Sequence, residues 1–82
     1  MLLGDFLKEL KHNSSWLEIR TNGYNVEYDD PDDLLLEGTL GGIKNNIYYQ
    51  NKYQNYGIAF LRVRYDKNMK CEFIIYIYKV ED

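Results

Sequence analysis

The stretch WLEIRTNGYNVEY (residues 16–28) contains the most specific local signal for the fold of this chain. Apolar and polar side chains alternate on both sides of an Asn-Gly pair, and a two-residue type I′ turn needs the positive φ angles that these two residue types tolerate. The pattern predicts a β-hairpin with its turn at positions 22–23. Its register places Ile19 opposite Val26 on one face and Glu18 opposite Glu27 on the other.

Two short helices are expected on either side of this hairpin. Leu3, Phe6, Leu7 and Leu10 recur at spacings of three and four, which predicts an amphipathic helix over residues 3–11. After the hairpin, the Asp-Pro pair at positions 30–31 has the chemistry of a helix start, because aspartate caps and proline suits the first helical position. We therefore expect a second, acidic helix of about two turns through residues 34–36, ending near Gly38.

The C-terminal half reads mainly as strands. Residues 56–65 and 70–80 predict a hairpin closed by a three-residue loop at 67–69, with the pairs Val63–Phe73, Leu61–Ile75, Ala59–Ile77 and Arg64–Glu72. Residues 73–78 are apolar on both faces, which indicates a central or covered strand. Cys71 is expected to face the core.

The tyrosine-rich stretch between these regions, residues 45–56, has one strand signal at positions 47–49. We expect a strand near residues 43–50 followed by a turn through 51–55, with a long tyrosine-bearing loop as the alternative.

These elements predict an α+β fold: an N-terminal helix, an antiparallel sheet of four to five strands, and a short acidic helix between hairpins. The 82 residues, 45% hydrophobic and 16% aromatic, are sufficient for a single compact domain over residues 1–82. The single cysteine excludes a disulfide scaffold, and together with the single histidine it makes a zinc site implausible, so neither a metal nor another cofactor is expected. Residues 1–7 do not resemble a signal peptide, and no segment reaches the length of a membrane span, so a cytoplasmic protein of the host cell is expected.

No catalytic motif is visible. His12 has no serine or cysteine partner at an interpretable spacing, and the glycines of residues 38–42 lack the ending of a phosphate-binding loop. The prediction is a non-enzymatic protein.

Charge is distributed unevenly along the chain. Residues 18–37 contain seven acidic side chains and one basic one, whereas residues 38–80 contain seven basic side chains and two acidic ones. The leading hypothesis is an acidic patch that binds a host protein with a basic groove. Capping and solubility explain the same acidic side chains equally well. The expected patch consists of Glu18, Glu27, Asp29, Asp30, Asp32 and Asp33.

Two other hypotheses remain open. The first is a single-stranded nucleic-acid face, in which aromatic rings stack on bases and cations contact phosphates. Its residues are Tyr48, Tyr49, Lys52, Tyr53, Arg62 and Arg64. The second is a homodimer in which a second copy buries the strand around Ile74 and Tyr76.

Three segments of the first half resemble the small accessory proteins of phages and mobile elements in low-GC Gram-positive bacteria. These segments are LGDFLKEL (residues 3–10), WLEIR leading into NG (16–23) and DDLL (32–35). Some proteins of this kind are anti-CRISPR inhibitors that bind a Cas nuclease where it holds DNA. The resemblance implies an inhibitor of a host defence protein that processes nucleic acid, with direct binding to nucleic acid less favoured.

Overall fold

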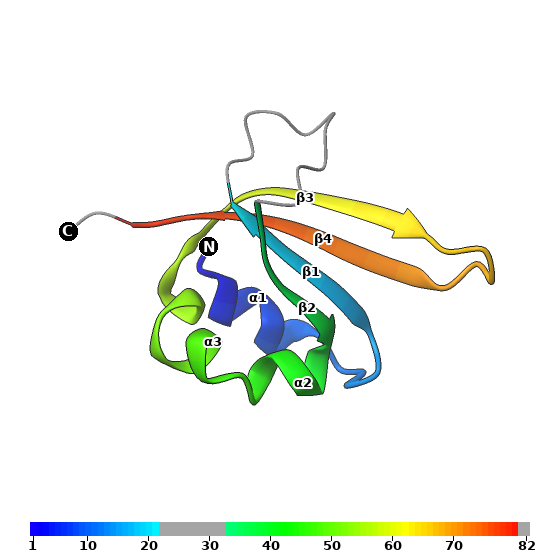
Figure 1. The fold of residues 1–82 in the computed structure, drawn as a ribbon, viewed down its shortest axis with the longest axis horizontal. Helices are drawn as coiled ribbons and strands as arrows, with labels where there is room; N and C mark the ends of the chain where they lie inside the picture. Colours follow the sequence, from blue (N-terminus) through cyan, green and yellow to red (C-terminus); the bar gives the residue numbers. More distant parts are fainter. Residues whose placement is uncertain (22–32, 81–82) are drawn as a thin grey trace.

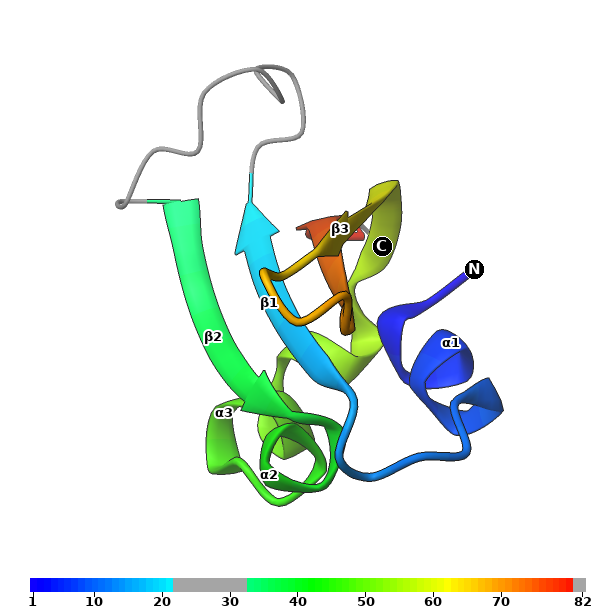
Figure 2. The same cartoon turned by 90° about the vertical axis from the view of Figure 1, so that its right-hand side faces the viewer.

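The computed structural model describes residues 1–21 and 33–80, which form a layer of short helices packed against one face of a four-stranded sheet (Figures 1 and 2). The strand order is β2-β1-β4-β3. The elements in chain order are α1 (Leu3–Glu9), β1 (Trp16–Thr21), β2 (Leu34–Thr39), α2 (Leu40–Lys44), α3 (Ile47–Asn51), the 3-10 helix η3 (Tyr53–Asn55), β3 (Gly57–Tyr65) and β4 (Cys71–Tyr78).

The sheet is mixed, and this corrects the expected antiparallel sheet. β1 is antiparallel to β2, and β3 is antiparallel to β4, but β1 and β4 run parallel at the centre. Local turn chemistry predicts antiparallel neighbours, whereas a parallel pair is set by the path of the chain between the two strands. Here that path passes through β2, three short helices and β3.

The expected acidic helix is wrong over its described part, because Leu34–Thr39 forms β2. Within the described residues, β1 has β2 on one side and β4 on the other, so Glu18 lies opposite Glu37, where the sequence predicted Glu27. The predicted turn at 22–23 and the predicted partner strand at 24–28 lie outside the described residues. A run of three leucines is compatible with either structure, and the hydrogen bonds offered by the edge of β1 favour the strand.

The expected strand near residues 43–50 is also wrong, because this stretch contains α2 and α3. Each helix has a side-chain cap at its start. The Thr39 hydroxyl accepts a hydrogen bond from the Gly42 amide at 3.2 Å, and the Asn46 side chain accepts one from the Tyr48 amide at 2.8 Å. Caps of this type satisfy amides that have no partner within the helix, and they offset the weak helix propensity of the tyrosines. The alternative, a long tyrosine-bearing loop, is also wrong, because these residues form helices.

Two predictions are confirmed in this part of the chain. α1 lies within the predicted residues 3–11, and β3 and β4 form the predicted hairpin with Val63 opposite Phe73 and Arg64 opposite Glu72. One pair differs: Ile58 lies opposite Ile77 in place of Ala59, because the register shifts between residues 58 and 60. A bulge of this kind adds one residue to one strand only.

The core lies between the helices and the sheet. Leu17 and Ile19 of β1 and Ile75 and Ile77 of β4 meet side chains from the three helices, and all four are at most 1% exposed. The helical members of this core cluster are Leu3, Leu7, Leu40, Ile43 and Tyr49. The central place of β4 confirms the interpretation of its doubly apolar sequence.

The turn between β3 and β4 holds one residue in the left-handed region. Met69 has φ 64°, the Asp66 carbonyl accepts a hydrogen bond from its amide at 2.9 Å, and the Asp66 amide donates to the Lys70 carbonyl at 3.0 Å. A three-residue hairpin loop that closes with a left-handed residue has these hydrogen bonds, and the left-handed position normally selects glycine.

Replacing Met69 with glycine should raise the free energy of unfolding by up to about 1 kcal/mol. The left-handed conformation costs an L-residue about 1–2 kcal/mol, and the added flexibility of glycine in the unfolded chain offsets part of the gain. Urea unfolding measures the change. Met69→Ala is the control, since it removes the same exposed side chain but keeps the strain and should give no gain. Equal stability of the glycine and alanine variants would contradict the assignment.

Candidate protein-binding surface

A cluster of charged side chains joins three strands on the sheet face opposite the helices. Because Leu17 and Ile19 face the core, the alternation along β1 places Glu18 and Arg20 on the other face. Arg64 of β3 donates from Nη2 to Glu18 Oε1 at 2.8 Å and to Glu72 Oε2 at 2.7 Å. Arg20 Nε lies 3.3 Å from Glu18 Oε2. The cluster therefore connects β1, β4 and β3 side by side.

The two guanidinium groups and the two carboxylates of this cluster balance each other in charge. The hydrogen bond to Glu18, followed by the one to Glu72, raises the pKa of Arg64 above its already high usual value. Glu18 is only 6% exposed, and both of its carboxylate oxygens are bonded to arginines. Its charge is neutralised within the protein, in contrast to the exposed acidic edge that the sequence suggested.

Substituting Glu18 with glutamine should destabilise the fold by about 1–3 kcal/mol, because it leaves the buried Arg20 beside a neutral group and weakens the bond to Arg64. Glu37→Gln is a matched control: Glu37 lies directly opposite on β2 and is exposed, so its loss should cost less than about 0.5 kcal/mol. Denaturant unfolding of both variants tests this. A similar cost for the two substitutions would show that the buried cluster does not support the sheet.

The acidic patch proposed from the sequence is not assembled by the described residues. Glu18 is buried in the charged cluster, and Asp33, which is half-buried, immediately precedes β2. The other four members, Glu27, Asp29, Asp30 and Asp32, lie outside the described residues. The part of the patch that the structure describes thus offers one carboxylate, that of Asp33, which makes no ion pair within the described residues.

The six residues of the alternative nucleic-acid face lie on two sides of the sheet. Four of them lie in the helical layer: Tyr48 and Tyr49 belong to α3, Tyr53 begins η3, and Lys52 lies between these two helices. Arg62 and Arg64 point to the opposite face, where Arg62 donates to the Tyr76 hydroxyl at 3.1 Å. Tyr49 is part of the core, and burial raises the pKa of its hydroxyl. The structure does not bring these residues together into one stacking surface.

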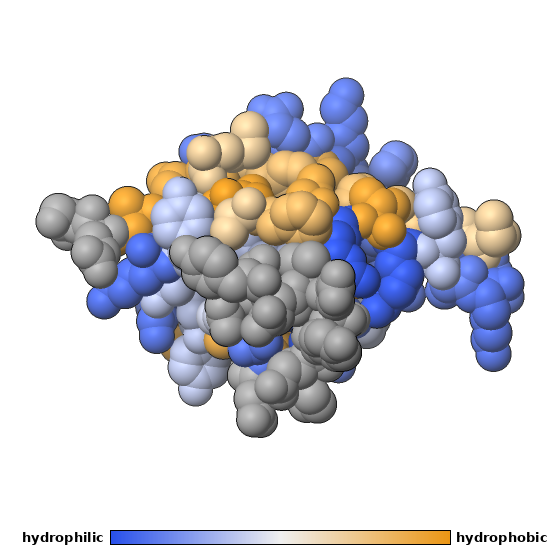
Figure 3. All heavy atoms as spheres, turned by 90° about the horizontal axis from the view of Figure 1, so that it is seen from above, coloured by the Kyte–Doolittle hydropathy of each residue, from blue (hydrophilic) through white to orange (hydrophobic). Residues whose placement is uncertain are grey.

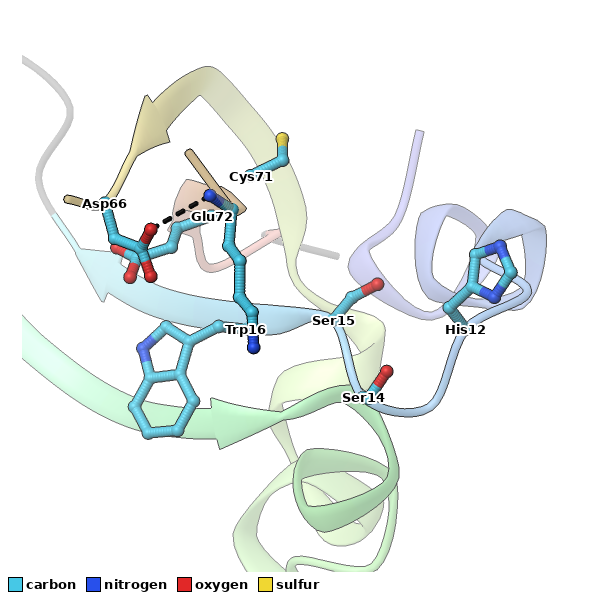
Figure 4. Close-up of a pocket in the computed structure, with 8 residues that line it drawn as sticks. His12, Ser14, Ser15, Trp16, Asp66, Cys71 and Glu72 are labelled. Atoms are coloured by element: carbon cyan, nitrogen blue, oxygen red, sulfur yellow. Dashed lines mark hydrogen bonds between the residues drawn. The ribbon is translucent and has the colours of Figure 1, made fainter. Parts of the chain in front are cut away.

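A hollow of about 460 Å³ opens between the segment before β1 and the end of the β3–β4 hairpin (Figure 4). His12, Ser15, Cys71 and Glu72 are among its lining residues. His12 stands at the opposite end of the hollow from Asp66 and Glu72. Among the described residues, no side-chain hydrogen bond joins His12, Ser15 and Cys71; the Ser15 amide donates only to the backbone carbonyl of His12. Cys71 is exposed, which corrects the expected core position of its thiol.

The reason for this correction is that the end of the β3–β4 hairpin extends beyond the helices (Figure 1). Its side chains on the helical side of the sheet therefore lose their cover. Leu61 is 39% exposed, Val63 50% and Tyr65 62%, so exposure increases toward the turn. Phe73 alone is partly covered there, by the edge of the Phe6 ring at 6.4 Å between centroids.

The sheet face opposite the helices also has apolar side chains at its surface (Figure 3), but Leu61, Val63 and Tyr65 lie on the helical side of the sheet. β3 is an edge strand in the described sheet. Met1 and Leu2 cover only its beginning: Leu2 bridges to Gly57, and the Met1 carbonyl accepts from the Ile58 amide at 3.1 Å. We call Leu61, Val63 and Tyr65, together with the backbone edge of β3 that they share, the hairpin surface.

Comparison of the chain with known protein families, characterised proteins and solved structures gave no match to any of them. Among residues 1–21 and 33–80, no helix is long and apolar enough to cross a membrane, and no group of three or more potential metal ligands is present.

Sequence reasoning found the β3–β4 hairpin but missed its exposed face. Leu61, Val63 and Tyr65 have the period-two pattern of a half-buried strand, and that pattern does not show whether anything covers the apolar side. Only the lengths of the folded elements reveal the mismatch: β3 has nine residues, whereas the helices α2 and α3 have five each.

Proposed function

We propose that this protein is a non-enzymatic protein-binding module that holds its partner on the hairpin surface. The observation that carries the proposal is the exposure of Leu61, Val63 and Tyr65 on a face that their own helices leave uncovered. A small protein gains stability by burying such side chains, and contiguous apolar side chains left at the surface commonly mark an interface. Tyrosine, which is 62% exposed here at position 65, is also a frequent interface anchor.

An inhibitor of a nucleic-acid-processing host protein, the role that the sequence resemblance implies, is one form of such a module. The hairpin also suits an acidic region of a partner better than a basic one. Residues 57–78 contain four basic side chains, Arg62, Arg64, Lys67 and Lys70. Residues 57–78 contain only two acidic side chains, Asp66 and Glu72, so the hairpin carries a net positive charge.

The proposal is tested by replacing Val63 and Tyr65 together with serine. This change removes apolar surface without adding charge, and it should reduce the capture of the partner from a lysate of the cells that carry the protein by about tenfold or more. Quantitative mass spectrometry of the captured proteins measures the loss.

The matched control is the double variant Ile47→Ser and Tyr48→Ser. These side chains are 62% and 64% exposed on α3, in the helical layer, so the control removes a similar apolar surface from a different site. Captured proteins should be the same for the control and the unmodified protein. If both double variants retained the same proteins as the unmodified chain, the hairpin surface would not be the binding site.

A further inference from the structure

We propose that the occupant of the hairpin surface is an extended peptide segment of another protein, in which apolar and acidic side chains alternate, added to β3 as a fifth strand. This inference rests on the proposed function and specifies the chemistry of the partner. Strand addition of this kind takes its affinity from main-chain hydrogen bonds and its specificity from alternate side chains.

The backbone of β3 offers the hydrogen-bonding groups that such a strand needs. The Asp66 amide bonds to the Lys70 carbonyl at 3.0 Å, and hydrogen-bonded pairs alternate along an antiparallel ladder. The register is regular from residue 60 to residue 65, so every second residue counted back from Asp66 bonds to β4. The residues between them, Leu61, Val63 and Tyr65, direct their amides and carbonyls away from β4. The three residues with exposed apolar side chains therefore also present the outward backbone groups.

The two ends of this edge limit the length of the added strand. At one end, Met1 and Leu2 occupy the edge beside Gly57 and Ile58 in an antiparallel bridge. At the other end, the chain turns at Asp66. The bridge shows that extended backbone already pairs with this edge, and the open part has room for about five residues of a partner.

The side chains of β3 select the chemistry of the partner. Leu61, Val63 and Tyr65 lie on the helical side, and a neighbouring strand places its own apolar side chains next to them. Arg62 and Arg64 lie on the other side, where acidic side chains of the partner would be complementary. The side chain of Arg64 is 42% exposed, and its hydrogen bonds to Glu18 and Glu72 use Nε and Nη2, which leaves the Nη1 donors for a further carboxylate.

A second copy of this chain fits the same edge less well. Antiparallel pairing of β3 with itself over residues 61–65 can be centred on residue 62, 63 or 64. Each of these registers opposes two arginines: Arg62 with Arg62, Arg62 with Arg64, or Arg64 with Arg64. Like charges directly opposite destabilise a strand pair, so charge complementarity favours an acidic partner over a copy.

The probe is a fluorescein-labelled nonapeptide in which glutamate and valine alternate, and fluorescence anisotropy measures its binding to the full chain. We expect binding that weakens as salt is added, and at least about tenfold weaker binding of the same peptide with lysine in place of glutamate. Equal binding of the two peptides would overturn the charge complementarity.

The backbone contact is tested with Val63→Pro, which removes one outward amide at an edge position that tolerates proline. Binding of the glutamate peptide should fall about tenfold, whereas Val63→Thr, which keeps the amide, should retain it. If the proline variant does not fold, the same contact is tested on the peptide by N-methylating either its odd-numbered or its even-numbered residues. One of these two sets supplies the amides that face β3, so methylating that set should abolish binding and methylating the other should preserve it. Unchanged binding of both methylated peptides would overturn the strand addition.

Two further results separate this inference from the proposed function. If the Val63 and Tyr65 serine variant loses its partner but the alternating peptide does not bind, the module stands and the added strand is wrong.

Sedimentation should show a monomer at micromolar concentration. A dimer that Val63→Pro dissociates would show that a second copy occupies the edge and would overturn the inference.

Discussion

The parallel pairing of β1 with β4 is the interaction on which the rest of the structure depends. It sets Leu17 beside Phe73 and Ile19 beside Ile75, and so combines the apolar faces of two separate strand pairs into one surface that the helices can cover. On the other face, the same register brings Glu18 of β1 within reach of Arg64 of β3, across β4. Without this central pair, each two-stranded unit would have too little buried surface to be stable.

The short helices explain why one part of the sheet is covered and another is exposed. Side-chain caps at Thr39 and Asn46 start α2 and α3, and each helix has only five residues. Helices of that length cover one end of the sheet, and β3 is longer than the layer beneath it. The exposed side chains of the hairpin surface are thus a consequence of the fold's dimensions. The charged cluster on the opposite face holds the same strand in place from the other side.

Elements with local signals could be predicted from the sequence. The spacing of Leu3, Leu7 and Leu10 was enough for α1, and the alternation on both sides of residues 67–69 was enough for the β3–β4 hairpin and most of its register. The candidate site could not be predicted in the same way. Glu18 was counted as an exposed acid because local charge does not show which arginines lie across the sheet. Arg64 is 46 residues away in the sequence.

The sequence by itself determined the class of the fold, its N-terminal helix, the C-terminal hairpin and the central place of β4, because each depends on side chains within a few residues of one another. Only the tertiary structure decided that residues 34–39 form a strand, that β1 and β4 are parallel, and which apolar side chains remain at the surface. These features depend on hydrogen bonds and contacts between segments far apart in the chain, where a strand edge or a neighbouring layer outweighs local preference.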